Sequence, residues 1–355
     1  MQSPPYTKKR LGEITVPSGT VLLIDFGLMD LWTHDRPPLI LPGILSDDAL
    51  ESANNGSDFK IEGPDAAEAG RRFGRQPNPH YLYDIPRHGV EELRESFESS
   101  ISQAGFRSNL VALAERVPPR RRVEQALEFG QGAGVVFLHG VHSIVVSGLP
   151  RDRALIVEGR AIDSGEFHGH WQDISLLVSD SEIARSLRIG YVAVDMARLM
   201  FCDVEAAGKW QHHETIDGLA DLVFWGKDAA RLANKFSAPI LDGHIYGFVD
   251  MPIQESIDLA MRVQSHLDQH HLVAAMDFRP HTDHWRMLKE LAGHETESGV
   301  IQLGDSHCCG FMTGWGDGFF PVYLELDAAA KIVAVRIELA TEETKKGMRR
   351  VNNFA

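Results

Sequence analysis

The sequence places Glu166, His168 and His170 at alternate positions of the segment EFHGHW. Alternate side chains of a β-strand point to the same face of the sheet, so these three would converge. One carboxylate and two imidazoles form a ligand set that suits a divalent zinc, iron or manganese ion. The segment therefore predicts a metal site. The alternative is an exposed polar strand face, or a turn that includes Gly165.

A second segment, GDSHCC (304–309), contains two adjacent cysteines beside a histidine. Cysteine attacks as the thiolate and needs a nearby group to activate it. On a strand, His307 and Cys309 would share one face, whereas Cys308 would point the other way. This spacing permits Cys309 as a nucleophile with His307 as its base. Two alternatives stay open: a small buried cysteine, or a metal site made of Asp305, His307 and one thiolate.

The glycine-rich segment GWGDG (314–318) follows directly. Its glycines permit positive φ in a tight loop, and Asp317 tolerates that conformation while accepting hydrogen bonds from nearby amides. Such a loop could hold a substrate, with Trp315 as a contact and Asp317 as a general base. It could equally be a compact turn that docks Trp315 on the core.

Two further candidates stand at the ends of predicted strands. Asp195 ends the apolar run YVAVD and is a second candidate base, and Arg279 is placed to hold a substrate carboxylate. The segment VLLIDFGLMDLW (21–32) resembles the stretch around Asp195, which would make Asp25 and Asp195 equivalent strand ends. Chance similarity between two buried strands is the alternative.

The segment RPHTDHW (279–285) has two histidines, His281 and His284, three positions apart. This spacing could chelate a metal within a helix. Because the helix is expected to begin near His284, we favour a capping role for Thr282 or Asp283 instead.

The elements that must position these residues follow from hydrophobic periodicity. Residues 1–44 read as strands that join the core, and 45–122 as a polar insertion with two helices, in 84–106 and 108–117. Residues 123–355 read as the main α+β domain, which opens with strands such as VEQALEFG and closes with a hairpin around Asp327 to Lys331. Within it, TIDGLADLVFW (215–225), KDAARLANKF, PIQESIDLAMRVQSHLDQ and DHWRMLKELAG are helical candidates. The predicted fold is α+β, with a β-rich core of mixed or antiparallel strands and helices packed on one side.

The segments YVAVDMARLMFCDVEAAGKW (191–210) and FMTGWGDGFFPVYLELDAAAKIVAVRIEL (311–339) resemble an uncharacterised, mostly bacterial family. Its signatures are a strand that ends in aspartate and a C-terminal hairpin of the form GWGDG-x-[FY]-PVY. The resemblance covers roughly the last 165 residues. This sequence departs from the pattern at Ala330, where the family's hairpin turn carries glycine. The resemblance implies a shared β-rich core and no particular reaction.

The composition of the chain excludes several classes of function. The chain of 355 residues has 35 basic and 50 acidic residues, a formal net charge of −15, which is unfavourable for binding nucleic acid. Three cysteines and a polar N-terminus predict a reduced, cytoplasmic protein, and the most apolar run (134–149) is too short to cross a membrane. No dinucleotide fingerprint, phosphate-binding loop or nucleophile elbow is present, so we expect no nucleotide cofactor.

We therefore predict a small-molecule enzyme, specifically a divalent-metal-assisted hydrolase. The alternative is a non-catalytic acidic binding protein of the immunity type, which would neutralise a basic protein partner. The sequence does not specify an oligomeric state.

Overall fold

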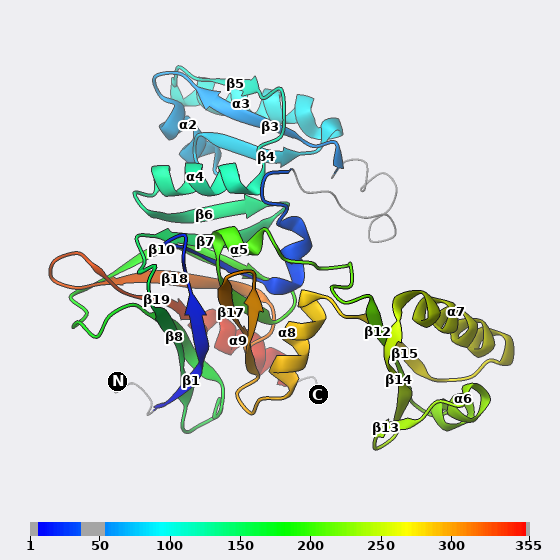
Figure 1. Ribbon diagram of the computed structural model, residues 1–355. Helices are drawn as coiled ribbons and strands as arrows, with labels where there is room; N and C mark the ends of the chain where they lie inside the picture. The colour runs from blue at the N-terminus through cyan, green and yellow to red at the C-terminus, as the bar shows by residue number, and fades with distance from the viewer. Residues whose placement is uncertain (1–5, 37–53, 353–355) are drawn as a thin grey trace. The chain divides into compact units, whose positions relative to one another are not determined.

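The computed structural model describes residues 6–36 and 54–352 (Figure 1). The chain divides into two compact units. The larger unit combines residues 1–209 with 291–355, and the smaller unit is the continuous stretch 210–290. The sequence-based division differs, because it kept 123–355 together as one domain.

Two six-stranded antiparallel sheets form the centre of the larger unit. Their inward-facing side chains, among them Ile14, Val157, Phe201 and Phe311, belong to one hydrophobic core. The first sheet has the order β1 (Tyr6–Thr15), β8 (Ala154–Ile162), β9 (Trp171–Leu177), β19 (Ile332–Glu338), β18 (Gly318–Leu326) and β10 (Arg185–Val194). The second has the order β16 (Ser298–Leu303), β17 (Ser306–Met312), β11 (Arg198–Asp203), β2 (Thr20–Ile24), β7 (Val141–Ser147) and β6 (Ala133–Leu138).

A third, three-stranded sheet in the larger unit has the order β4 (Tyr81–Ile85), β3 (Ser57–Glu62) and β5 (Asn109–Ala112). It has its own small core, where Leu93 and Phe97 of α3 (Val90–Ala104) and Ala69 of α2 (Ala66–Phe73) pack on Phe59. Among the described residues, this unit also contains η1 (Phe26–Leu31), η2 (Arg87–Gly89), α4 (Pro119–Phe129), α5 (Val204–Ala207) and α9 (Glu342–Asn352).

The smaller unit is a four-stranded antiparallel sheet with the order β13 (Ile240–Asp242), β14 (Ile245–Pro252), β12 (Leu219–Trp225) and β15 (Ala275–Pro280). Leu222 and Phe224 of β12 pack with Leu232 of α6 (Ala229–Phe236) and Val263 of α7 (Ile253–His270). Since side chains alternate along a strand, Asp221 and Val223 point to the opposite face. The helix α8 (Asp283–Ala292) follows β15.

The prediction of a β-rich protein that combines antiparallel sheets with helices is confirmed. The finer prediction, that the helices pack together on one side of the core, is not confirmed. Helices α2 and α3 pack on the three-stranded sheet, whereas α6 and α7 pack on the four-stranded sheet. None of the helices within 6–36 and 54–352 combines the length and apolarity that crossing a membrane requires.

Three local predictions are wrong. VEQALEFG belongs to helix α4, whereas TIDGLADLVFW contains strand β12 and 108–117 contains strand β5. In β12 five successive residues, 220–224, are buried, so it lacks the alternation by which a half-buried strand is recognised. Helix α4 begins at Pro119, because proline suits the first turn of a helix.

Candidate metal centre

The segment EFHGHW does not form a strand. Residues 163–170 are a turn between β8 and β9, in which Gly165 and Gly169 adopt φ of +88° and +87°. Glu166 accepts a hydrogen bond from Arg349 (2.9 Å), and the His170 ring lies 4.7 Å from that of Trp315. The turn that includes Gly165, the alternative interpretation, is therefore the correct one. Glu166, His168 and His170 are not among the described residues that bring three ligand atoms together.

The cysteines lie on β17, and their surroundings do not favour a nucleophile. Cys309 is fully buried in the core, where burial raises the pKa of its thiol to about 12. His307 is exposed, and its backbone N–H donates to the Thr15 hydroxyl (2.9 Å). A thiol with this pKa is neutral at physiological pH, so Cys309 is a core residue rather than an activated thiolate.

The GWGDG segment is a compact turn. The Trp315 indole N–H donates to the Trp171 carbonyl (2.7 Å), and its ring packs beside Phe167 (5.2 Å between centroids). Trp315 is buried, so it is not available as a substrate contact. The Asp317 carboxylate accepts the backbone N–H of Ala197 (2.8 Å), which ties this turn to the one that follows β10.

Asp195 lies in that second turn, at the end of β10. The backbone N–H groups of Asp195 and Met196 both donate to the Asp25 carboxylate at 2.9 Å, and Gly27 N–H donates to its other oxygen. Burial raises the pKa of the Asp25 carboxyl although these amides stabilise its charged form. Asp25 and Asp317 thus hold three consecutive amides, 195–197, and both act on the architecture of the larger unit.

One set of side chains does converge as metal ligands require. Among the described residues, Asp221, Asp250 and His281 form the group whose ligand atoms all lie within 4.8 Å of one another. His281 Nε2 is 3.1 Å from Asp221 Oδ1 and 3.8 Å from Asp250 Oδ1. Asp221 is almost fully buried, whereas Asp250 is exposed.

The sheet of the smaller unit creates this group. Asp221 is on β12, Asp250 on the neighbouring β14, and His281 directly follows β15 on the other side of β12. The pairing of β12 with β14 changes register, because Ala220 pairs with Met251 and Leu222 with Phe248. The extra residue makes a bulge in β14 that includes Asp250, whose φ is +55°. A bulge turns a side chain away from its regular direction. The Asp250 N–H donates to Asp221 Oδ1 (2.9 Å), which fixes the bulge over β12.

The other ring nitrogen of His281 has a carboxylate partner of its own. Nδ1 lies 2.8 Å from Asp217 Oδ2, and the second oxygen of Asp217 accepts from Leu219 N–H (2.9 Å) and from the Thr215 hydroxyl (3.0 Å). Metal-bound histidines commonly donate their second ring N–H to a carboxylate, which fixes the ring orientation and makes the ligand more basic. Partial burial would lower the pKa of His281, but its hydrogen bonds to Asp217 and Asp221 outweigh burial and raise it.

Arg279, the predicted substrate clamp, lies beside this group. It is paired in register with Asp221, so both side chains leave the same face of the sheet. Its Nε donates to Asp277 Oδ2 (2.6 Å), and its guanidinium stacks on the Trp285 ring at 4.4 Å. Asp277 is half exposed. A cation and a free carboxylate edge are therefore available next to the three converging ligands.

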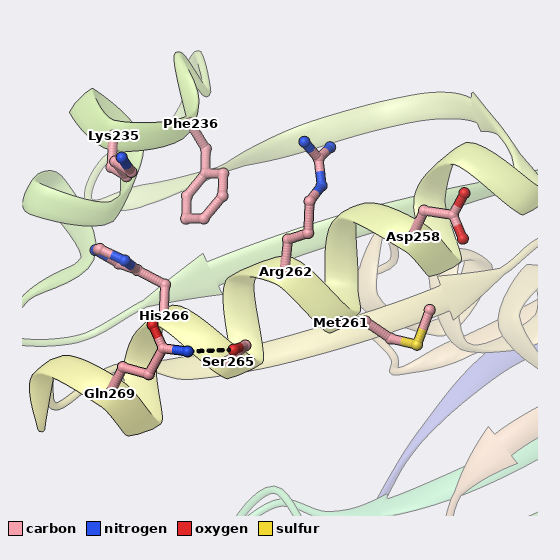
Figure 2. A pocket seen from close by; sticks show the side chains of 8 residues that line it. All are labelled: Lys235, Phe236, Asp258, Met261, Arg262, Ser265, His266 and Gln269. Atoms are coloured by element: carbon pink, nitrogen blue, oxygen red, sulfur yellow. Dashed lines mark hydrogen bonds between the residues drawn. The ribbon is translucent and has the colours of Figure 1, made fainter.

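A second hollow in the smaller unit has a different character. It lies along α6 and α7, has a volume of about 560 Å³, and is lined by Lys235, Phe236, Asp258, Met261, Arg262, Ser265, His266 and Gln269 (Figure 2). Desolvation lowers the pKa of His266, and the positive charges of Lys235 and Arg231 add to this effect. Its lining has two cationic side chains, Lys235 and Arg262, against one carboxylate, Asp258, so it is a poorer place for a metal ion than the group around His281.

Sequence reasoning missed Asp217, Asp221 and Asp250 and gave His281 another role. The segment TIDGLADLVFW is predicted as a helix, whereas residues 219–225 of it form strand β12, which carries Asp221. The capping prediction for RPHTDHW was better: the Thr282 hydroxyl accepts the Trp285 N–H (3.1 Å) at the start of α8. One feature of the sequence could have indicated the site: Asp221 stands inside the apolar run LADLVFW. A carboxylate that is buried in such a run needs a partner.

Comparison with protein families matches residues 223–337 to a family described as a protein of unknown function (DUF4241). This span is consistent with the uncharacterised family that the C-terminal segments resemble. It contains Asp250 and His281 and begins two positions after Asp221. Comparison with curated proteins and with solved structures finds no match.

Proposed function

We propose that Asp221, Asp250 and His281 bind a divalent cation and that the protein is a metal-assisted hydrolase. The observation that carries this proposal is the position of the His281 ring. Nε2 faces two carboxylates at 3.1 and 3.8 Å, while Nδ1 is held at 2.8 Å by Asp217. This is the arrangement of a metal ligand with an orienting carboxylate behind it.

The ligand chemistry limits the choice of ion. Two carboxylates and one imidazole form a hard to intermediate donor set, which suits manganese, zinc or ferrous iron better than a soft ion. A cation would also neutralise the two carboxylates, one of which is almost fully buried. Three protein ligands leave coordination positions for water and substrate, as catalytic sites require.

A cation at this position would supply hydrolytic chemistry of a general kind. It lowers the pKa of a bound water towards neutrality and polarises a substrate carbonyl or phosphoryl oxygen. Arg279, on the same face, would receive an anionic group of the substrate. Asp277 would accept the proton that the water releases. The substrate class that fits is a small ester or amide with a carboxylate or phosphate group.

Metal analysis tests the first step. Protein purified without a histidine tag is incubated with manganese or zinc, dialysed and analysed for bound metal. We expect about one equivalent in the wild type and in the His168→Ala/His170→Ala control, and a large loss in Asp250→Asn. Asparagine tolerates the positive φ of Asp250, so this variant keeps the bulge. Metal that persists in Asp250→Asn but disappears from the control would assign binding to the EFHGHW turn instead.

Hydrolysis of p-nitrophenyl acetate and of bis-p-nitrophenyl phosphate, with and without the metal, tests the second step. Metal-dependent turnover that is lost in Asp250→Asn supports the enzyme. Metal that binds stoichiometrically without any turnover of either ester would contradict this choice of substrate class.

The alternative, a binding protein, is favoured by one separate observation. The β13–β14 hairpin at the edge of the smaller sheet exposes Ile240 (65%), Val249 (51%) and Ile245 (38%). Clustered exposed apolar side chains on an edge strand are typical of a surface that another protein covers. If an Ile240→Lys/Val249→Lys variant loses a copurified partner while its metal content is unchanged, the binding function gains support.

A further inference from the structure

The larger unit contains a cavity of about 500 Å³ that the proposed metal site does not involve. It lies beside the end of β4 and the turn between β6 and β7. Ile85, Pro86 and Phe137 supply apolar walls, and Asp84, His139 and Arg75 supply polar groups. A cavity of this size accommodates a small organic molecule.

A buried ion network forms the polar wall. The Asp84 carboxylate accepts two hydrogen bonds from Arg122 (2.7 and 2.8 Å) and one from Arg116 (2.9 Å). Arg122 is fully buried and also lies 3.3 Å from the buried Asp58. The two carboxylates and the two guanidinium groups balance in charge, so the network itself neither attracts nor repels an anion. It does hold the wall rigidly.

His139 presents a fixed donor to the cavity. Its Nε2 lies 2.9 Å from Arg116 Nη2, and a guanidinium has no acceptor, so Nε2 must accept and the proton is on Nδ1. Burial also lowers the pKa of His139, which keeps the ring neutral. Nothing within 6–36 and 54–352 accepts a hydrogen bond from Nδ1–H. The side chain of His139 is only 11% exposed and lines the cavity, so this unused donor is available to a molecule bound there.

The backbone around the cavity is constrained. Asp84 and His139 both adopt left-handed conformations, with φ of +58° and +45°. The His139 N–H donates to the Asp84 carboxylate (2.8 Å), so each residue helps to hold the other. Unfavourable conformations that the surroundings enforce are concentrated at ligand-binding sites, where they place side chains before the ligand arrives.

Arg75 supplies the charge. Its guanidinium lies over the Phe73 ring at 5.1 Å, and in the part of the chain that the structure describes it has no carboxylate partner. The network in the wall is balanced, so Arg75 leaves the cavity with a surplus of positive charge. This is unusual in a chain whose formal net charge is −15.

We propose that this cavity binds a small organic carboxylate with an apolar body. The carboxylate is received by Arg75, an acceptor oxygen takes the Nδ1–H of His139, and the body packs on Phe137, Ile85 and Pro86. Arginine and a preorganised neutral donor together recognise an anion more strongly than either does alone. The proposal is independent of the metal site, which lies in the other unit.

Benzoate is the probe, and benzamide, which has the same ring without the charge, is its control. Saturation-transfer NMR titrations compare the wild type with Arg75→Gln and His139→Asn. Arg75 is exposed, so Arg75→Gln keeps the fold, and asparagine tolerates the φ of His139. We expect saturable benzoate binding by the wild type, about tenfold weaker binding by each variant, and benzamide binding at least as weak as that of the variants.

Three results would overturn the proposal: no saturable benzoate binding by the wild type, equal benzoate affinity in wild type and Arg75→Gln, or equal affinity for benzoate and benzamide. Thermal melting of each variant shows whether it is folded. If His139→Asn is unfolded, Arg75→Gln alone decides.

Discussion

The Asp25 carboxylate accepts the backbone N–H of Asp195 at 2.9 Å, across 170 positions of the sequence. Asp25 follows β2 and Asp195 follows β10, so this hydrogen bond joins the two large sheets. The sequence similarity between the two segments suggested equivalent strand ends. In the structure both residues do follow a strand, they are also hydrogen-bond partners, and Asp25 is the buried one.

Asp25→Asn should destabilise the protein by about 1–3 kcal/mol, because the amide group would turn a donor towards N–H groups that need an acceptor. Asp317→Ala is the matched comparison. It removes one exposed hydrogen bond to the same turn and should cost about 0.5–1.5 kcal/mol. Urea unfolding measures both, and an equal loss would contradict the central role of Asp25.

The buried pair of Asp84 and Arg122 predicts a pH dependence. Desolvation opposes ionisation of Asp84, but its hydrogen bonds to Arg122 prevail and hold its pKa well below the ordinary value of 3.8. A lowered folded-state pKa stabilises the protein above pH 3.8, and this stabilisation fades as the pH falls below about 4.

Asp84→Asn keeps the left-handed backbone and should cost about 3–5 kcal/mol at pH 7, because it leaves two guanidinium groups, Arg116 and Arg122, with Asp58 as the one remaining carboxylate of the network. Urea unfolding of both proteins between pH 3 and 7 checks this. The gap between wild type and variant should narrow towards pH 3; a gap that is constant over the whole range would exclude the carboxylate as its cause.

At the proposed metal site, the Asp217 carboxylate that orients His281 provides a further prediction. Asp217→Asn should weaken manganese or zinc binding by about 10–100-fold, although Asp217 is not itself a ligand. Excess metal should raise the melting temperature of the wild type, with a stabilisation of about 2.7 kcal/mol at one hundred times the dissociation constant. Asp228→Asn, in a loop of the same unit, serves as control. If it weakens binding as much as Asp217→Asn, the effect is general rather than local.

The cysteines should be unreactive in the folded protein. Cys202, Cys308 and Cys309 are all free and fully buried. Iodoacetamide should therefore label them slowly and at similar rates, with fast labelling only in urea. Selective labelling of Cys309 in the native protein would restore the nucleophile hypothesis.

Ala330 departs from the family's pattern, and it adopts φ of +60° in the β18–β19 turn. Left-handed geometry destabilises the folded protein by about 1–2 kcal/mol when the residue is alanine, and glycine avoids this cost. Glycine also makes the unfolded chain more flexible, which lowers the free energy of unfolding by about 0.4–1 kcal/mol. Ala330→Gly should thus stabilise the protein by about 0.5–1 kcal/mol. Ala329→Gly, at a neighbour without positive φ, should destabilise it. Urea midpoints of the two variants compare these signs directly.

Local signals in the sequence predict an element correctly where its own hydrophobic period or turn residues determine the structure. The helix α7 and the β18–β19 hairpin around Asp327 to Lys331 were predicted correctly, because each has a clear apolar period or turn signal. The EFHGHW strand failed because Gly165 and Gly169 turn the chain there. Glycine spacing alone does not distinguish a turn from a flexible strand.

The proposed metal site could not be predicted from such local signals. Asp221, Asp250 and His281 meet only because β12 pairs with β14 on one side and with β15 on the other. The register shift beside Asp250 decides where its carboxylate points, and a register is a property of paired strands rather than of either strand.

The division of the chain also bears on how it is made. The larger unit needs β16 to β19, which follow residue 290, and β18 and β19 lie between β9 and β10 in its first sheet. A ribosome therefore synthesises every strand of the smaller unit before the strands that complete the larger one. Since domains fold as units during synthesis, Asp221, Asp250 and His281 can come together while the core that begins at the N-terminus is still unfinished.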